Sequence, residues 1–386
     1  MKGFELSIGR AGAPLHAAAH SHHPWPDVSF AAQQAAWVDA ARLLDRKWDH
    51  IFGEIIPAAQ RHIARQLSLP DPGTIAFGPN THSFVLRLLS CLPADRPARV
   101  LTTGSEFMSF TRQIARLEED GLVQVTRIAT EPFDSFDARF IDAERAGGHD
   151  LVFLSQVYFD SGFAVGNLEK IVRAVPNPET FIVIDGYHGF MAIPTDISAI
   201  AARAFYLAGG YKYAMAGEGT CFLHCPPGHG ARPRDTGWYA GFGSLEAASQ
   251  DVPYQSDGSR FLGATFDVSG LYRFNAVQEW LTMEGLSVDH MLAHVRGVER
   301  AFLAELDHLK TPINRAILLI PDESHRGRFL AFRTPDANAI VEKLGRQNII
   351  VDSRGDRLRV GFGIYHEAER AVWLARELAS LLLNSP

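Results

Sequence analysis

Cysteine is scarce in this chain of 386 residues, which contains only Cys91, Cys221 and Cys225. An odd, small number of cysteines in a long chain does not fit the disulfide framework of a secreted domain. It fits a reducing compartment instead. We therefore expect a cytoplasmic protein without structural disulfides.

Long apolar runs are also missing from the sequence. No segment approaches the ~20 consecutive apolar residues that a helix needs to span a bilayer. The opening segment MKGFELSIGRAGAPLHAAAH lacks the apolar centre of an export signal. Positive charge is limited, because 37 Lys and Arg stand against 44 Asp and Glu and give a net charge of -7. We therefore expect neither a membrane nor a nucleic acid as a partner.

What the sequence does contain is an alternation of two kinds of segment, without internal repeats or low-complexity tracts. Short apolar runs predict strands, and amphipathic segments between them predict helices. The expected strands are TIAFG, RVLTT, VQVTRIA, LVFLSQVYF and FIVIDGYH, and the expected helices are THSFVLRLLSCL, FTRQIARLEEDG, DARFIDAERAGG and NLEKIVRAV. Strands that alternate with helices predict βαβ units and a mainly parallel sheet that is buried on both faces.

The two ends of the chain read differently from this middle part. After an irregular arm, apolar residues at helical spacing predict one long or two consecutive helices, with Asp27 as a cap. Beyond Leu271 long helices precede the strand-like runs RFLAFRTP, NIIVDSR and RLRVGFGIY. We expect an α/β protein with an N-terminal arm (1–30), a large domain with a mainly parallel sheet (31–270) and a smaller α+β C-terminal domain (271–386).

The stretch AFYLAGGYKYAMAGEGTCFL places a single lysine, Lys212, in apolar and glycine-punctuated surroundings. A lysine usually keeps its ammonium group in water and only packs its stem on apolar surface. A buried lysine instead has a lowered pKa and a nucleophilic amine, as Schiff-base chemistry requires. Lys212 is therefore either a snorkelling side chain or a reactive amine.

Three other segments carry suggestive groups directly after predicted strands, where ligands of parallel sheets bind. FIVIDGYHGF ends in Asp185 and His188, which are either a cap and a core histidine or partners of a pyridine cofactor. GPNTHS opens a helix, so that Thr81 and His82 are either ordinary cap residues or part of an anion site. Phe107 in TTGSEFMSF is either a core residue or a ring that stacks on a planar ligand.

The order and spacing of these segments resemble the fold-type I pyridoxal-phosphate enzymes of the aminotransferase class V group, and within it kynureninase. The resemblance runs from about Arg61 to the C-terminus. It implies a Schiff base of the cofactor at Lys212, which lies in the motif Tyr-Lys-Tyr with Tyr211. It also implies that Asp185 and His188 hold the pyridine ring, Phe107 stacks on it, and Thr81 and His82 lie at the phosphate.

Downstream segments extend the resemblance. TGWYAGFG and SRFLGATF are similar to two family motifs that imply a homodimer, in which Trp238 and Thr265 reach the phosphate of the partner subunit. VDSRGDRLRVGFGIY is similar to the family segment whose second arginine grips the substrate carboxylate, which falls on Arg359. A guanidinium suits this task because it matches a carboxylate with two N–H groups. Arg354 is the second candidate, and a surface ion pair is the alternative for both arginines.

Two departures from the family pattern concern the substrate. Phe110 stands where kynureninase has an aspartate, so one active-site carboxylate is missing. AAHSHHPWPD replaces the family's glycine-rich entry segment and brings His20, His22 and His23 towards the pocket. We count His22 and His23 among the candidate substrate-binding residues and expect no metal there, because a cluster with Asp27 as its only nearby carboxylate is not a known closed site.

The resemblance leaves the reaction open. Hydrolytic side-chain cleavage of an α-amino acid follows from the likeness to kynureninase, whereas transamination is favoured by the missing carboxylate. Cysteine desulfuration is a weaker alternative, because it needs a mobile cysteine near the carboxylate site and none lies after Cys225. A cofactor-binding protein without catalysis would require an unreactive Lys212.

Overall fold

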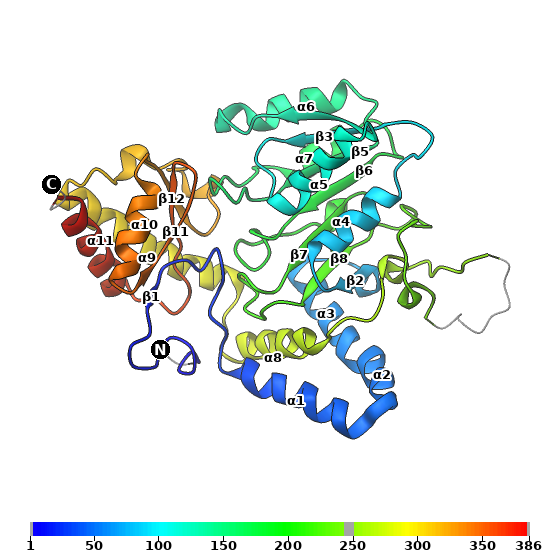
Figure 1. The fold of residues 1–386 in the computed structure, drawn as a ribbon, viewed down its shortest axis with the longest axis horizontal. Coiled ribbons are helices and arrows are strands. Elements are labelled where there is room, and N and C mark those ends of the chain that lie inside the picture. The colour runs from blue at the N-terminus through cyan, green and yellow to red at the C-terminus, as the bar shows by residue number, and fades with distance from the viewer. Residues whose placement is uncertain (1–2, 243–250, 384–386) are drawn as a thin grey trace.

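The computed structural model describes residues 3–242 and 251–383. Its largest feature is a sheet in the order β2-β8-β7-β6-β5-β3-β4 (Figure 1). The strands are β2 (Ile75–Gly78), β3 (Ala98–Thr103), β4 (Val123–Ile128), β5 (Leu151–Ser155), β6 (Phe181–Asp185), β7 (Phe205–Gly209) and β8 (Cys221–His224). The pairs β4/β3, β3/β5, β5/β6 and β6/β7 are parallel, whereas β8 runs antiparallel to both β2 and β7.

Helices cover both faces of this sheet, because the central strands are mostly apolar and their side chains alternate between the two faces. In β5, Val152 and Leu154 face one apolar core, and Leu151 and Phe153 face the other. Residues of α3, α6, α7 and α8 fill the first core, and residues of α4 and α5 fill the second. The bounds are α3 (Ile56–Leu67), α4 (Thr81–Ser90), α5 (Met108–Glu119), α6 (Phe136–Arg145), α7 (Leu168–Ala174) and α8 (Ser269–Met283). The predicted α/β class with a mainly parallel sheet is confirmed.

A smaller α+β unit with its own apolar core follows α8. Its three-stranded antiparallel sheet has the order β11-β12-β9, and β10 pairs in parallel with β1 of the N-terminal arm. The bounds are β1 (Leu15–His16), α9 (Val288–Leu309), β9 (Leu330–Arg333), α10 (Ala337–Arg346), β10 (Ile349–Ile350), β11 (Asp352–Arg354), β12 (Arg357–Val360) and α11 (Ala368–Leu383).

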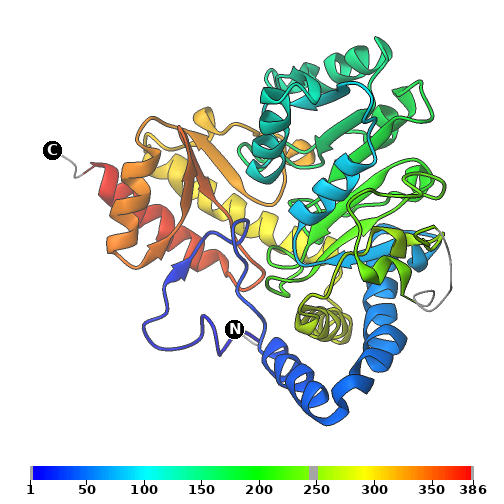
Figure 2. The same ribbon diagram turned by 45° about the vertical axis from the view of Figure 1, so that its right-hand side comes forward.

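The arm connects the small unit to the helices that open the large one. Figures 1 and 2 show it passing from the small unit to α1 (Val28–Leu43), which lies beside α8. The chain then continues through α2 (Lys47–His50) and a π-helical turn (Ile51–Ile55) into α3. The expectation of one long or two consecutive helices is met by α1 and α3, which are connected by a 3-10 turn (Leu44–Arg46), by α2 and by the π-helical turn.

The place where the two units divide follows from the packing of α8. This helix contributes Leu271, Phe274 and Val277 to the core of the large unit. We therefore propose that the boundary lies after α8 rather than at residue 271. None of the helices in the described ranges is long and apolar enough to cross a bilayer.

Candidate active site

The side chains predicted from separate strand ends lie around one cavity of about 170 Å³. Thr81 and His82 begin α4 after β2, Phe107 precedes α5 after β3, and Asp185 ends β6. They meet because the carboxyl ends of parallel strands lie at the same edge of a sheet. Lys212, which follows β7, completes this set. Asn80, Ser155, Phe159, Tyr187, His188, Tyr211, Glu218 and Cys221 are further lining residues.

The amine of Lys212 is buried at the wall of the cavity. Its Nζ lies 2.7 Å from Nε2 of His188, and 4.7 Å and 5.3 Å from the ring centroids of Tyr187 and Phe107. Burial lowers the pKa of Lys212 to about 7, although the nearby Asp185 carboxylate acts in the opposite direction. A large share of this lysine is therefore neutral near pH 7, which is the nucleophilic form.

His188 is the polar partner of this lysine. Burial, and then the charge of Lys212, lower the pKa of His188 well below its usual value, so the imidazole is neutral. We infer that Nε2 accepts a hydrogen bond from the lysine, because the lysine carries N–H donors in both of its charge states and its ammonium form cannot accept. The N–H group then lies on Nδ1, which is buried without a hydrogen-bond partner in the described ranges.

Asp185 lies at the end of β6 with its carboxyl group at the cavity. Its Oδ1 accepts a hydrogen bond of 2.8 Å from the backbone N–H of Tyr187. Burial raises the pKa of Asp185, and the charge of Lys212 partly opposes this effect. The next residue is Gly186, where a side chain has no room, because a Cβ atom would lie 2.0 Å from the ring of Tyr206. Asp185 is thus a partly buried acid that a cationic ligand would stabilise in its charged form.

The first turn of α4 forms another part of the cavity wall. Asn80 caps this helix, with its Oδ1 accepting a hydrogen bond of 2.9 Å from the N–H of Ser83. Thr81 and His82 lie at the positive end of the helix dipole, where an anion is favoured. Phe107 contacts Phe159 edge to face, with ring centroids 5.3 Å apart. The site therefore combines an amine, an acid, an aromatic ring and a helix N-terminus.

The sequence interpretation missed one carboxyl group, that of Glu106. This side chain is buried behind Ser155 and accepts hydrogen bonds from the hydroxyl groups of Thr103 (2.7 Å) and Ser155 (2.6 Å). Burial raises the pKa of Glu106 to about 8. The available signal was an acidic residue three positions after the strand run RVLTT. Phe110, in contrast, stacks on Phe153 in the core at 3.7 Å, and so it supplies no polar group to the cavity.

The arm histidines lie beside the cavity but do not line it. His20 is buried and its Nε2 lies 2.9 Å from Oδ1 of Asp352. His22 stacks on Tyr211 with ring centroids 5.0 Å apart, and His23 donates its backbone N–H to the carbonyl of Tyr211 (3.1 Å). Within the described ranges, no group of three or more His, Cys, Asp or Glu side chains has the geometry of a metal site.

The two candidate arginines differ in their surroundings. Arg359 is buried, forms a two-pronged ion pair with Asp352 and donates from one terminal nitrogen to the carbonyl of Phe159. Arg354 is more exposed and lies 3.7 Å from the same aspartate. Arg359 thus lies directly behind the cavity wall at Phe159, whereas Arg354 lies farther out. A role of either arginine in substrate binding stays a prediction.

Trp238 and Thr265 lie away from the cavity of their own chain. They contact each other through a hydrogen bond of 3.1 Å from the indole Nε1 to the threonine hydroxyl, and Trp238 is 40% exposed. The polar segment GSLEAASQDVPYQSDG, which the sequence predicts to be a loop, stands between them in the sequence, and its residues 243–250 fall outside the described residues. Their predicted role at a partner subunit's phosphate also stays a prediction.

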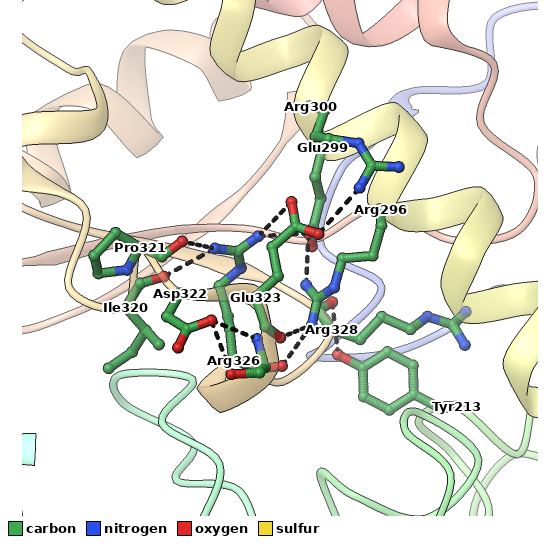
Figure 3. A network of polar contacts seen from close by, with 11 residues as sticks. Tyr213, Arg296, Glu299, Arg300, Ile320, Pro321, Asp322, Glu323, Arg326 and Arg328 are labelled. Carbon is green, nitrogen blue, oxygen red and sulfur yellow. Dashed lines mark hydrogen bonds and ion pairs between the residues drawn. The ribbon is translucent and has the colours of Figure 1, made fainter. Parts of the chain in front are cut away.

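The segment of Lys212 is anchored from behind by the small unit. The hydroxyl of Tyr213 donates a hydrogen bond of 3.1 Å to the carbonyl of Arg328, whose guanidinium lies over the tyrosine ring (Figure 3). Beside this contact, Glu299 accepts from Arg296 (2.6 Å) and Arg326 (3.2 Å). This buried network ties α9 and the 326–328 segment to the residue that follows the lysine.

Comparison with known proteins gives one family and a set of related folds. The family model of the aminotransferase class-V proteins matches residues 45–370. No curated protein sequence matches the chain at a significant level.

Similar solved structures include the apo cysteine desulfurase of Thermococcus onnurineus NA1, with a TM-score of 0.80, 16% identity, and 100% and 99% of the two chains covered. The cystine C-S lyase C-DES in complex with cysteine persulfide has a TM-score of 0.79 and 16% identity, and the match covers 97% of this chain and 99% of the lyase. The cysteine desulfurase CsdA of Escherichia coli has a TM-score of 0.78 and 15% identity, and the match covers 98% of each chain. At these identities the likeness shows a shared fold.

Proposed function

Because the chain belongs to the aminotransferase class-V family of pyridoxal-phosphate enzymes, we propose that it breaks the Cα–H bond of an α-amino acid with Lys212 as the base. The observation that carries this proposal is the buried amine of Lys212, 2.7 Å from a neutral His188, at the wall of a cavity that also contains Asp185. Protons at such a carbon are removed only when the resulting electron pair is delocalised. Pyridoxal phosphate supplies that electron sink when it is bound.

The residues around the cavity fit this cofactor. Asp185 would hold the pyridine nitrogen, because a partly buried acid with a raised pKa is stabilised as a carboxylate by an N–H⁺ partner. Phe107 would pack on the ring, and the first turn of α4 with Thr81 and His82 would hold the phosphate. His188, with its unpartnered Nδ1, adds a buried polar group beside the reactive lysine.

The amine of Lys212 and the residues that hold it have different tasks in this proposal. Its amine takes the proton from Cα and returns it to the carbon atom that the reaction requires. His188 keeps the amine oriented without competing for the proton, because burial holds the imidazole in its neutral form. Tyr213, fixed on the carbonyl of Arg328, holds the lysine segment in place from the opposite side.

Substrate recognition is assigned to Arg359. Its guanidinium uses Nε and both terminal nitrogens on Asp352 and on the carbonyl of Phe159. These three contacts engage three of the five N–H groups of an arginine and leave one on each terminal nitrogen. Two N–H groups on adjacent nitrogens are what a carboxylate accepts in a two-pronged pair. Exposed Arg354 and the stacked His22 would lie nearer to the rest of the substrate.

For the reaction that follows, we propose side-chain cleavage of the kynureninase type, which the motif resemblance supports. Transamination is the second candidate, favoured by Phe110, because that position supplies a core ring where kynureninase has a carboxylate. C–S bond cleavage is the third candidate, and the similar solved structures, which include cysteine desulfurases and a cystine C-S lyase, support it. An enzyme thiol for desulfuration is less well supported. Cys221 is the cysteine at the cavity, and burial raises its pKa to about 12, so that its nucleophilic thiolate form is disfavoured.

The test is product analysis with the purified holoenzyme. L-Kynurenine, L-cysteine, L-cystine, and L-alanine with 2-oxoglutarate are incubated separately, and the products are identified by mass spectrometry. Anthranilate and alanine indicate side-chain cleavage, glutamate indicates transamination, and sulfide or persulfide indicates C–S chemistry. A protein that exchanges no Cα hydrogen of any amino acid with deuterated water would contradict the proposal as a whole.

A further inference from the structure

The N-terminal arm contributes a buried side chain to the surroundings of Arg359. His20 is fully buried, and its Nε2 lies 2.9 Å from Oδ1 of Asp352. The same oxygen accepts a hydrogen bond of 2.8 Å from Nε of Arg359, and the second oxygen accepts from a terminal nitrogen. The three side chains form a continuous chain from the arm, through β11, to β12.

The hydrogen-bond pattern fixes the protonation of His20. Asp352 is an acceptor, because its pKa lies far below its ordinary value through His20 and Arg359, despite burial. Burial lowers the pKa of His20 to about 4, so the ring is neutral near pH 7. Its single N–H group must then lie on Nε2 and point at Asp352. The ring also stacks on Phe329, with centroids 4.6 Å apart at an angle of 22°.

Backbone contacts hold His20 in this place. Ala19 donates its N–H to the carbonyl of Gly361 (3.0 Å), and Gly361 donates to the carbonyl of Ala17 (2.8 Å). A Cβ atom at position 361 would lie 2.2 Å from Nδ1 of His20, which explains the glycine directly after β12. On the other side of His20, the backbone N–H of His23 reaches the carbonyl of Tyr211 (3.1 Å). The arm therefore connects the strand of Arg359 to the segment of Lys212.

We propose that His20 is a positioning residue that orients Arg359 through Asp352 for binding the carboxylate of the substrate. An aspartate that holds one edge of a guanidinium fixes the plane of that group and therefore the direction of its free N–H groups. His20 in turn limits the rotation of Asp352 by occupying the oxygen that faces the arm. The proposal rests on the proposed function, in which Arg359 binds a carboxylate.

The experiment separates carboxylate recognition from general damage with two probes. L-Alanine and ethylamine both carry an amine, and L-alanine alone carries a carboxylate. Each is titrated into the holoenzyme, and the dissociation constant is read from the absorbance of the bound cofactor. The ratio of the two constants reports what the carboxylate contributes to binding.

His20→Leu is expected to raise the dissociation constant of L-alanine about tenfold and to leave that of ethylamine within about twofold, because one charge-assisted contact is lost. His20→Gln, which retains a donor at a similar reach, should restore L-alanine binding to within about threefold of the wild type. His308→Leu, at an exposed histidine on α9, is the matched control and should change neither constant. Asp352→Asn provides the same test if the leucine variant does not fold, and it should act in the same direction.

Arg359→Lys separates the carboxylate-binding role of Arg359 from the positioning role of His20. If this variant weakens L-alanine selectively and the His20 and Asp352 variants do not, the positioning role is wrong and the function of Arg359 stands. If Arg359→Lys leaves the ratio unchanged, the carboxylate binds elsewhere, and both the assignment of Arg359 and the role of His20 are overturned. Equal weakening of both probes by His20→Leu would also overturn the proposal, because it would show a structural effect.

Discussion

The amine of Lys212 lies 2.7 Å from Nε2 of His188, and burial lowers the pKa of both groups. The pair sits at the edge of the sheet where β6 and β7 end. The two bases do not repel each other in their neutral forms, because a neutral imidazole and a neutral amine form an ordinary hydrogen bond. This arrangement keeps a nucleophilic lysine available near neutral pH.

Removal of this amine should abolish turnover without unfolding the protein. Lys212→Ala is expected to lower kcat by at least about 10³-fold, since a general base contributes about 10² to 10⁴-fold and the attachment to the cofactor is lost as well. After borohydride reduction, mass spectrometry should find the cofactor on Lys212 in the wild type and on no residue of the variant. Lys170→Ala, at a lysine on α7, is the control. Full turnover by Lys212→Ala would refute the assignment.

The pKa of Lys212 predicts a reactivity that changes near pH 7. In the cofactor-free protein, reductive methylation of Lys212 by formaldehyde should rise with pH and level off above about pH 8, because only the neutral amine reacts and burial lowers the pKa to about 7. Asp185→Asn should move the midpoint to lower pH, since the carboxylate stabilises the ammonium form. Peptide mass spectrometry measures the extent, with Lys170 in the same digest as a reagent control. A midpoint above pH 9 would contradict the burial of the amine.

Asp185 should matter for the chemistry more than for the fold. Asp185→Asn is expected to lower kcat/KM by about 10² to 10⁴-fold, because a pyridine nitrogen without a carboxylate partner is a weaker electron sink. The variant should still bind the cofactor, which absorbance and equilibrium dialysis measure. Asp196→Asn, at an aspartate in the loop after β6, is the control. A loss of less than about threefold, below about 1 kcal/mol, would exclude the role.

A buried acid far from the cavity gives a prediction for stability. Both carboxyl oxygens of Glu144 lack a hydrogen-bond partner within the described ranges, and burial raises its pKa to about 8. The unfolded chain loses this proton near pH 4.5, and the folded chain keeps it to about pH 8. Glu144 therefore makes the fold less stable as pH rises through this window.

Glu144→Gln should remove that dependence. The variant should gain roughly 1–3 kcal/mol in the free energy of unfolding at pH 8 relative to the wild type, and much less at pH 4.5. Urea unfolding at both pH values measures the difference, with Glu342→Gln at an exposed position of α10 as the control. An equal effect at both pH values would show that the proton is not involved.

Much of this architecture follows from local patterns in the sequence. The strands β2 to β6 and the helices between them were predicted because each apolar run is short, and each helix has apolar residues on one side. The grouping of Thr81, Phe107, Asp185 and Lys212 followed from one rule, the common edge of parallel strands.

Contacts between distant segments could not be predicted from local patterns. The chain of His20, Asp352 and Arg359 joins residues that are more than three hundred positions apart, and no local periodicity encodes it. The local pattern after β3 singles out Phe107 and not its neighbour Glu106. Its burial depends on Ser155 from another strand. Phe110 lies on the buried face of α5 together with Ile114, which the helix pattern allows, but its stacking partner Phe153 comes from another element and cannot be read from that pattern.

The exposed pair of Trp238 and Thr265 leads to a prediction about assembly. The two residues contact each other 3.1 Å apart, and they lie outside the cavity of their own chain. If they serve the phosphate of a second copy, the protein is a homodimer with composite sites, and two inactive chains can complement each other. A Lys212→Ala chain and a Trp238→Ala, Thr265→Ala chain, refolded together, would form one intact site in each mixed dimer.

Random pairing makes about half of the dimers mixed, so about a quarter of the wild-type activity should return. Activity after co-refolding is compared with that of each variant refolded alone, and sedimentation measures the oligomeric state. The matched control pairs Lys212→Ala with Asp185→Ala, because both residues line the same cavity of one chain. An intact site could form in this mixed dimer only if the lysine and the aspartate of one site came from different chains. Since we expect Lys212 and Asp185 from the same chain, that mixed dimer keeps one lesion in each site and recovers nothing. Recovery in the control, or none in the test pair, would show that the division of residues between subunits is wrong.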